Sequence, residues 1–386
     1  MEPRLMEPVV VTGVGLASAL GNDAQTAWHR LLANESAIAL RQPFLALPPG
    51  PLAMIGKTPA AIKPLVETTV LAALTDAQLS SPLPDCGIVI GSSRSHQGEW
   101  EALARQRSGQ TECAQAHQTA WLDTLPHQTA LRAAQQVGSR GPVLAPMAAC
   151  ATGIWALAQG VELIRSGQCD RVIAGAVEAP ITPLTLAGFA KMGAQAHTGC
   201  YPFDEAREGL VLGEGAAVMV LERASLAARR GVPVYGEIRG FGLLNDAHHI
   251  TSPVAHTAIS AVRQCLQRSR LAPADIDFIQ THGTATQRND QIEAAIATAV
   301  FPKTIAITAT KGATGHTLGA SGAMGTVFSL LALRHQQLPP CVGLKTPAFD
   351  LNFVREATAA PLNHAICCSF GFGGQNTVVA LSRANT

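Results

Sequence analysis

The chain has 386 residues, of which 47 % are hydrophobic and 14 % are charged, and its formal net charge is +1. This nearly neutral balance gives no indication of binding to nucleic acids or anionic membranes, and a content of 4 % aromatic residues argues against base-stacking platforms. Because an average globular protein is about 25 % charged, the low charge content predicts a thick multilayer core or a large subunit interface.

Neither secretion nor membrane insertion is indicated. No apolar run reaches the roughly 18–20 residues of a membrane span. The start, MEPRLMEPVVVTGVG, has glutamate and proline where a signal peptide has its apolar segment. The nine cysteines lack CxxC spacing, which indicates reduced thiols rather than a disulfide framework or a zinc site. We therefore expect a cytoplasmic protein without a bound metal.

Strands and helices alternate from the first residues onward, which is typical of an α/β protein with buried sheets. The strands predicted in the first half span residues 8–15, 86–93 and 170–179, with a helix over 26–38. A further helix opens at Cys150, and its apolar residues repeat at helical spacing from Ile154 to Ile164. Among small neighbours in AACATG, Cys150 is either a buried structural residue or a nucleophile at a helix N-terminus.

The second half repeats this order of elements. Its predicted strands span residues 232–242, 276–286, 364–374 and 376–382, and its predicted helices span 256–269, 290–300 and 324–337. Within the strand over 364–374, the adjacent Cys367 and Cys368 are expected on opposite faces.

The chain therefore reads as two copies of one unit, residues 1–230 and 231–386, which join near Arg229–Val232. In the first copy, a turn carrying Cys150 precedes the third helix. In the second copy, the corresponding turn carries His316. Because a duplicated fold brings equivalent loops together across a pseudo-twofold axis, we expect Cys150 and His316 to share one site.

Three further stretches carry reactive residues or glycines. THGTATQRND places His282 at the end of a predicted strand, KGATGHTLGASG places His316 five residues after Lys311, and SFGFGGQN is a glycine-rich turn. Taken singly, each has a structural explanation as a core histidine or a tight bend. The phosphate-binding pattern GxxxxGK[ST] is not met.

Taken together and in order, AACATG, HGTAT…ND, TKGATGHTLGASG and SFGFGGQN resemble the β-ketoacyl-acyl-carrier-protein synthases, the elongating condensing enzymes of the thiolase superfamily. YPFDEAREGLVLGEGA and NDAHHITSP match as well, so the resemblance spans almost the whole chain. It implies a duplicated thiolase-like fold with five αβαβα layers. A histidine at position 316 is similar to the Cys-His-His branch, whereas thiolases have Cys-His-Cys and the initiating and chalcone-type enzymes have Cys-His-Asn.

The resemblance implies a decarboxylative condensation that yields a 3-oxoacyl-acyl-carrier protein. Cys150 would take an acyl group from the phosphopantetheine of a carrier protein, and a malonyl thioester would then lose CO2. His282 and His316 would present N–H groups to the enolate oxygen that this step leaves. A position at a helix N-terminus near imidazoles leads us to expect a lowered pKa for the Cys150 thiol.

The resemblance also implies roles for the residues around these three. Lys311 and Glu293 match a charged pair that fixes the tautomer and orientation of the histidines. Phe372 matches a gate between the acyl pocket and the malonyl site. The backbone N–H groups of Cys150 and Phe372 would bind the oxyanion.

The implied partners are an acidic acyl carrier protein and a second subunit. We expect a homodimer, and a heterodimer with a related subunit stays open. No nicotinamide, flavin or metal cofactor is implied. Lys57 and Lys63 lie in the region that relatives use to bind the carrier protein.

Several alternatives remain at this point. A non-catalytic chain-length-factor-like partner lacks the nucleophile, whereas this chain has all three residues. A papain-like hydrolase lacks support because its CGSCW signature is absent. A dinucleotide site at VVVTGVGLASALG is disfavoured by Ser18 at the third glycine position. Two segments depart from the family pattern: GSSRSHQGEW stands where relatives have the glycine-rich GSGIGG, and residues 110–143 look shorter than in relatives. The acyl chain length therefore stays open, and so does the pathway, which is either fatty-acid synthesis or specialised polyene or polyketide synthesis.

Overall fold

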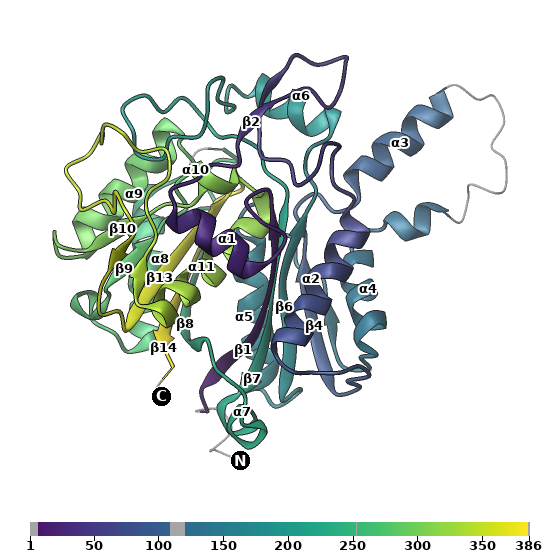
Figure 1. Ribbon diagram of the computed structural model, residues 1–386, viewed down its shortest axis with the longest axis vertical. Helices are drawn as coiled ribbons and strands as arrows, with labels where there is room; N and C mark the ends of the chain where they lie inside the picture. The colour runs from purple at the N-terminus through teal and green to yellow at the C-terminus, as the bar shows by residue number, and fades with distance from the viewer. Residues whose placement is uncertain (1–6, 109–119, 252, 385–386) are drawn as a thin grey trace.

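The computed structural model describes residues 7–108, 120–251 and 253–384. A ten-stranded sheet with the order β10-β9-β13-β14-β8-β1-β7-β6-β4-β5 runs through the molecule (Figure 1). The strands of its first half are β1 (Val9–Ser18), β7 (Gly215–Arg223), β6 (Arg171–Glu178), β4 (Cys86–Gly91) and β5 (Val143–Leu144). Those of its second half are β8 (Gly236–Asn245), β14 (Gln375–Arg383), β13 (His364–Gly371), β9 (Phe278–Gln280) and β10 (Ala306–Thr308).

The two halves of the sheet have the same topology. In the first half, β7 runs antiparallel to β1 and β6, while β4 is parallel to β6 and β5 is parallel to β4. In the second half, β14 runs antiparallel to β8 and β13, while β9 is parallel to β13 and β10 is parallel to β9. The halves meet where Val9–Val11 of β1 pair with Gly236–Ile238 of β8. The duplication is thus confirmed, while the division at residue 230 stays a prediction.

Helices form three layers around the two halves of the sheet. The first outer layer contains α2 (Ile62–Asp76) and α4 (Gln128–Val137), the central layer α5 (Thr152–Arg165) and α11 (Ser321–His335), and the second outer layer α8 (Ala255–Ser269) and α9 (Gln287–Val300). Figure 1 shows α2 and α4 on one side of the molecule and α9 on the other. The five-layered αβαβα arrangement is therefore confirmed.

Alternating strand residues face the central and outer layers, as the period of a strand requires. Cys367 packs in the central core and Cys368 in the core beneath α8 and α9, so their expected opposite orientation is confirmed. The central helix α11 is buried from Ser321 to Leu333. This stretch contains only small, apolar and hydroxyl side chains, because a helix between two sheets has no solvent face.

The two central helices approach closely at their N-terminal ends. A Cβ atom added to Gly153 of α5 would lie 2.5 Å from the Ala323 nitrogen of α11 and 3.1 Å from the Gly319 oxygen. Only glycine leaves room for this contact. The turns that precede α5 and α11 are therefore held side by side.

The remaining elements connect these layers. The helices are α1 (Ala24–Leu32), α3 (Gln97–Ser108), α6 (Pro183–Lys191), α7 (Ala224–Arg230) and α10 (Lys311–Thr314), and the 3-10 turns are η3 (Ala120–Thr124), η4 (Pro273–Asp275) and η5 (Leu318–Ala320). Two small sheets pair β2 (Ala39–Arg41) with β3 (Gly50–Leu52) and β11 (Gln337–Leu338) with β12 (Thr358–Ala359).

Two predicted elements are shortened most. The helix predicted over 26–38 ends at Leu32, because Asn34 has a left-handed backbone with φ 58°. The strand predicted over 276–286 pairs only as β9, because Gly283 (φ 48°) and Ala285 (φ 62°) turn the chain out of the sheet.

The observations on membrane spans and thiols concern the described ranges. None of the helices there is long and apolar enough to cross a membrane. The eight cysteines within these ranges are free thiols and all are buried. Cys113, and part of the segment 110–143 that looked short, lie outside the described residues.

Candidate active site

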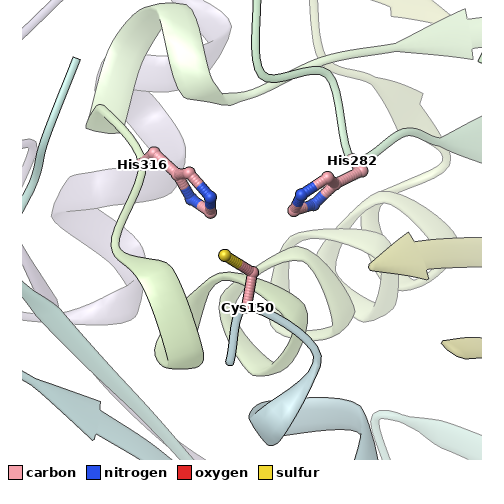
Figure 2. Close-up of side chains that lie close together, drawn as sticks. All are labelled: Cys150, His282 and His316. Atoms are coloured by element: carbon pink, nitrogen blue, oxygen red, sulfur yellow. The ribbon is translucent and has the colours of Figure 1, made fainter. Parts of the chain in front are cut away.

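Three chain segments from the two copies converge on one point. Cys150 lies between β5 and α5, His282 follows β9, and His316 lies between α10 and η5. The Cys150 sulfur and one ring nitrogen from each histidine lie within 4.8 Å of one another. Figure 2 shows the sulfur directed towards the space between the two imidazoles. The structure therefore brings together the three residues that the sequence singled out.

The backbone around Cys150 is tightly constrained. Ala149, directly before it, has a positive φ of 48°, a costly conformation for a residue with a Cβ atom. The Ser369 hydroxyl donates to the Cys150 carbonyl at 2.9 Å. A Cβ atom on Gly371 would lie 3.2 Å from the Cys150 nitrogen. The small residues of AACATG and the glycine of β13 thus let the second copy approach the nucleophile.

Lys311 and Glu293 both act on His282. The Glu293 carboxylate accepts the backbone N–H groups of His282 and Gly283, each at 2.6 Å. Lys311 Nζ lies 3.3 Å from His282 Nδ1 and also donates to the His282 carbonyl. Because an ammonium group has no lone pair, Nδ1 must accept, and the ring carries its proton on Nε2.

A different partner holds His316. Its backbone pairs with the strand-like segment beside it, through Val211 and Gly213. Its Nδ1 lies 2.9 Å from the Ser321 hydroxyl, which in turn lies 3.1 Å from the Thr317 hydroxyl. A hydroxyl can donate or accept, so this contact permits either tautomer of His316. The two imidazole rings stand nearly perpendicular, with centroids 5.2 Å apart.

Burial sets the protonation of the three residues. Desolvation, and then the positive charge of Lys311, lower the pKa values of His282 and His316 well below 6.5, so both rings are neutral. Burial raises the pKa of the Cys150 thiol to about 12, and the opposing charge of Lys311 does not compensate. The lowered thiol pKa expected from the sequence is therefore wrong. Helix α5 starts two residues later, and desolvation is the largest effect on the thiol.

The groups behind His282 are equally desolvated. Burial raises the pKa of Glu293 to about 7 and lowers the pKa of Lys311, while the negative charge of Glu293 raises that of Lys311. The Asn289 side-chain amide donates to Glu293 at 2.7 Å. The sequence did not single out Asn289 or Ser321. Each lies inside a motif that carries a catalytic candidate, Asn289 in THGTATQRND and Ser321 in KGATGHTLGASG, and this position was the signal that could have found it.

A cavity of about 450 Å³ leads to the three residues. Its wall contains the three residues themselves, and the other lining residues include Phe370, Phe372, Phe189, Met192–Ala194, His249–Thr251, Thr284 and Thr286–Asn289. The Phe189 and Phe372 rings stack with centroids 6.2 Å apart and share an apolar cluster with Cys150. Phe372 precedes two glycines with positive φ, Gly373 and Gly374. The cavity wall beside Cys150 thus includes a stacked aromatic pair.

The donor atoms of Cys150, His282 and His316 also form a set that could hold a metal ion. Zinc accepts a thiolate and imidazoles. However, the Lys311 ammonium beside His282 places a positive charge behind the site, and the thiol is protonated at rest. The arrangement suits nucleophilic attack and hydrogen bonding to an oxyanion better than it suits a resident cation.

Comparison with known proteins agrees with this geometry. The chain matches the family models of the beta-ketoacyl synthase N-terminal domain over residues 62–227 and C-terminal domain over residues 235–345. It is 29 % identical to 3-oxoacyl-[acyl-carrier-protein] synthase 2 of Staphylococcus aureus (strain COL), over 97 % of this chain and 98 % of the relative. It is 38 % identical to the mitochondrial 3-oxoacyl-[acyl-carrier-protein] synthase of Arabidopsis thaliana, over 62 % of this chain and 56 % of the relative.

Solved structures share the whole fold. A ketosynthase structure in complex with its type II polyketide synthase acyl-carrier protein, bound to the hexaketide, superposes with a TM-score of 0.91 at 25 % identity. The ishigamide ketosynthase/chain length factor gives 0.92 at 25 % identity, and a beta-ketoacyl synthase from Burkholderia phymatum STM815 gives 0.88 at 27 % identity. Each match covers 98 % of this chain and 100 % of the other. The chain therefore belongs to the beta-ketoacyl synthase family.

Proposed function

We propose that the protein condenses an acyl group held on Cys150 with a malonyl-acyl-carrier protein, releasing CO2 and a 3-oxoacyl-acyl-carrier protein. The convergence of one thiol and two neutral imidazoles at the inner end of the cavity carries this proposal. Both the S. aureus and the Arabidopsis relatives are named as synthases of this product.

Acyl transfer requires the Cys150 proton to leave as the sulfur attacks. The S–C bond to Cys150 forms, the thioester bond to phosphopantetheine breaks, and the proton passes to a neutral imidazole and then to the departing thiol. His316 suits this task, because it can donate Nδ1–H to Ser321 and keep a lone pair on Nε2. Because burial raises the pKa of the Cys150 thiol to about 12, the thiol needs this base to lose its proton.

The oxyanion of this step needs fixed donors close to the sulfur. The backbone N–H groups of Cys150 and Phe372 are our candidates, and the close approach of Gly371 to the Cys150 nitrogen supports them. One such donor contributes roughly 3–4 kcal/mol of transition-state stabilisation. The stacked Phe189 and Phe372 would close the site around the acyl group.

Condensation then uses both imidazoles as donors. As the bond from the malonyl carbon to CO2 breaks, negative charge moves to the thioester oxygen, and the Nε2–H of His282 and of His316 would stabilise it. The resulting carbanion forms a C–C bond with the acyl carbonyl, the bond from that carbon to the Cys150 sulfur breaks, and the sulfur takes up one proton from solvent, which the loss of the malonyl carboxylate as CO2 requires. Lys311 fixes His282 as a donor, whereas the Ser321 hydroxyl allows His316 to change tautomer between the two steps.

A carrier protein and a second subunit complete this picture. The edge strand β5 and the segment after it expose Leu144 (38 %) and Met147 (54 %), and an unpaired apolar sheet edge favours association. We expect a homodimer, and a heterodimer with a related subunit stays open. Lys57 and Lys63 remain predicted contacts of an acidic carrier. A chain-length-factor role is the second candidate, favoured only by the similarity to the ketosynthase/chain length factor structure.

Mass spectrometry of the intact protein after incubation with an acyl-carrier thioester tests the proposal. We expect the acyl mass on Cys150, its loss in Cys150→Ala, and its persistence in Cys169→Ala, a control at another buried thiol. His316→Ala should still be acylated slowly but should lose malonyl decarboxylation. An unmodified wild-type Cys150 would favour the non-catalytic role.

A further inference from the structure

A rigid loop after β4 presents a cationic side chain next to the active site. The buried Glu178 carboxylate accepts the backbone N–H of Ser93 at 2.6 Å, that of Arg94 at 3.0 Å and the Ser93 hydroxyl at 2.6 Å, and it also accepts the Ser92 hydroxyl. These contacts clamp the backbone of residues 92–94. The position of Arg94 is therefore fixed, and only its side chain is free to move.

The Arg94 guanidinium contacts the aromatic wall of the cavity. Its Cζ atom lies 5.8 Å from the centre of the Phe189 ring, and Phe189 stacks on Phe372. Phe189 also belongs to the apolar cluster that contains Cys150. The charge of Arg94 lowers the pKa of the Cys150 thiol, after the larger effects of burial, Lys311 and Glu178. Arg94 thus contacts Phe189, and Phe189 lines the cavity in which an acyl group on Cys150 would lie.

The guanidinium is incompletely satisfied. Its Nε–H group is buried and has no hydrogen-bond partner among the described residues. A buried donor without a partner is costly, and contact with an aromatic ring replaces only part of its lost hydration. A saturated hydrocarbon chain offers no acceptor. An oxygen atom on the acyl chain would supply one, and a guanidinium binds carboxylate or carbonyl oxygens well.

We infer that Arg94 is a specificity-determining residue and that the preferred acyl group carries an oxygen acceptor, a carboxylate or a keto oxygen, which the guanidinium binds beyond Phe189. This inference rests on the proposed function, because it concerns the group held on Cys150. The replacement of a glycine-rich segment by GSSRSHQGEW, which the sequence left unexplained, then has a chemical role.

The test compares three acyl-carrier thioesters of equal chain length, one with a methyl end (hexanoyl), one with a keto group (5-oxohexanoyl) and one with a terminal carboxylate (adipoyl). The rate of Cys150 acylation is measured by mass spectrometry for the wild type, Arg94→Met, Arg94→Lys and the control Lys191→Met, which removes an exposed cation at the end of α6. The keto and carboxylate arms distinguish the two sources of the oxygen.

We expect the wild type and Lys191→Met to prefer an oxygenated chain by about tenfold or more, the factor typical of one charge-assisted hydrogen bond. Arg94→Met should lose this preference and keep its melting temperature, while Arg94→Lys should retain part of it. Equal ratios of rates in the wild type and Arg94→Met would overturn the inference, as would loss of the dimer in Arg94→Met. Failure of every thioester to acylate the wild type would instead count against the proposed function.

Discussion

The contact between the two central helices gives the sharpest test of how the fold holds the site. Gly153→Ala adds one methyl group at the point where α5, which follows Cys150, meets α11, which follows His316. The new Cβ atom would lie 2.5 Å from the Ala323 nitrogen and 2.9 Å from its Cβ atom, whereas ordinary contact begins at 3.4 Å. The helices must therefore separate by about 0.9 Å, since both atoms belong to the rigid N-terminal turn of α11.

Two opposing effects decide the stability of this variant. Alanine is favoured over glycine in a helix by about 0.5–1 kcal/mol, whereas overpacking a dense core costs about 1–3 kcal/mol. We expect a net loss of about 1 kcal/mol. The effect on chemistry is larger, because a misplacement near 1 Å between reacting groups lowers the rate by about 10²-fold.

Guanidinium unfolding at one protein concentration and the rate of Cys150 acylation measure the two effects. The matched control is Gly188→Ala in α6, where an added Cβ atom meets nothing within 4 Å, so stability should rise slightly and activity should persist. A Gly153→Ala protein with wild-type stability and acylation rate would refute the idea that this helix contact sets the distance between Cys150 and His316.

Three other outcomes are expected. Lys311→Met should lower malonyl decarboxylation by about 10²-fold with a smaller effect on Cys150 acylation, because His282 loses the partner that fixes its tautomer; unchanged CO2 release would contradict this role. The native imidazoles of His282 and His316 bind protons less readily than the unfolded ones, whose pKa is 6.5, so they make the unfolding free energy fall as the pH drops below 6.5. Glu293, with its pKa raised from 4.5 to about 7, has the opposite effect over that interval. As the pH falls from 7 to 5, the melting temperature of Glu293→Gln should therefore fall more steeply than that of the wild type. Parallel curves of melting temperature against pH would show that Glu293 does not titrate in this range. Alkylation of Cys150 by iodoacetamide should keep accelerating above pH 9 because the thiol pKa is raised to about 12, and a plateau near neutral pH would show that the thiol is activated at rest.

Local patterns were enough to predict much of this architecture. Strand and helix periods, read between small-residue turns, gave the repeated order of elements, because side-chain periodicity follows from backbone geometry alone. The expected equivalence of the turns carrying Cys150 and His316 followed from that repeat. The assignment of Cys150, His282 and His316 to one catalytic site came from the resemblance of the ordered motifs to a known family, because each motif taken singly also had a structural explanation.

Other features depend on contacts between residues far apart in the chain. The neutral thiol of Cys150 results from burial in an apolar cluster with Leu212 and Leu318, which lie far from it in the chain, and no short stretch encodes the depth of that burial. Lys311 meets His282 across 29 positions of the chain, and the Ser369 hydroxyl meets the Cys150 carbonyl across 219, so both contacts exist only because the elements that carry these residues pack together. Arg94 likewise meets Phe189 across separate segments. Desolvation and long-range distances arise from the packing of all five layers, and for that reason the protonation and support of the site became visible only in three dimensions.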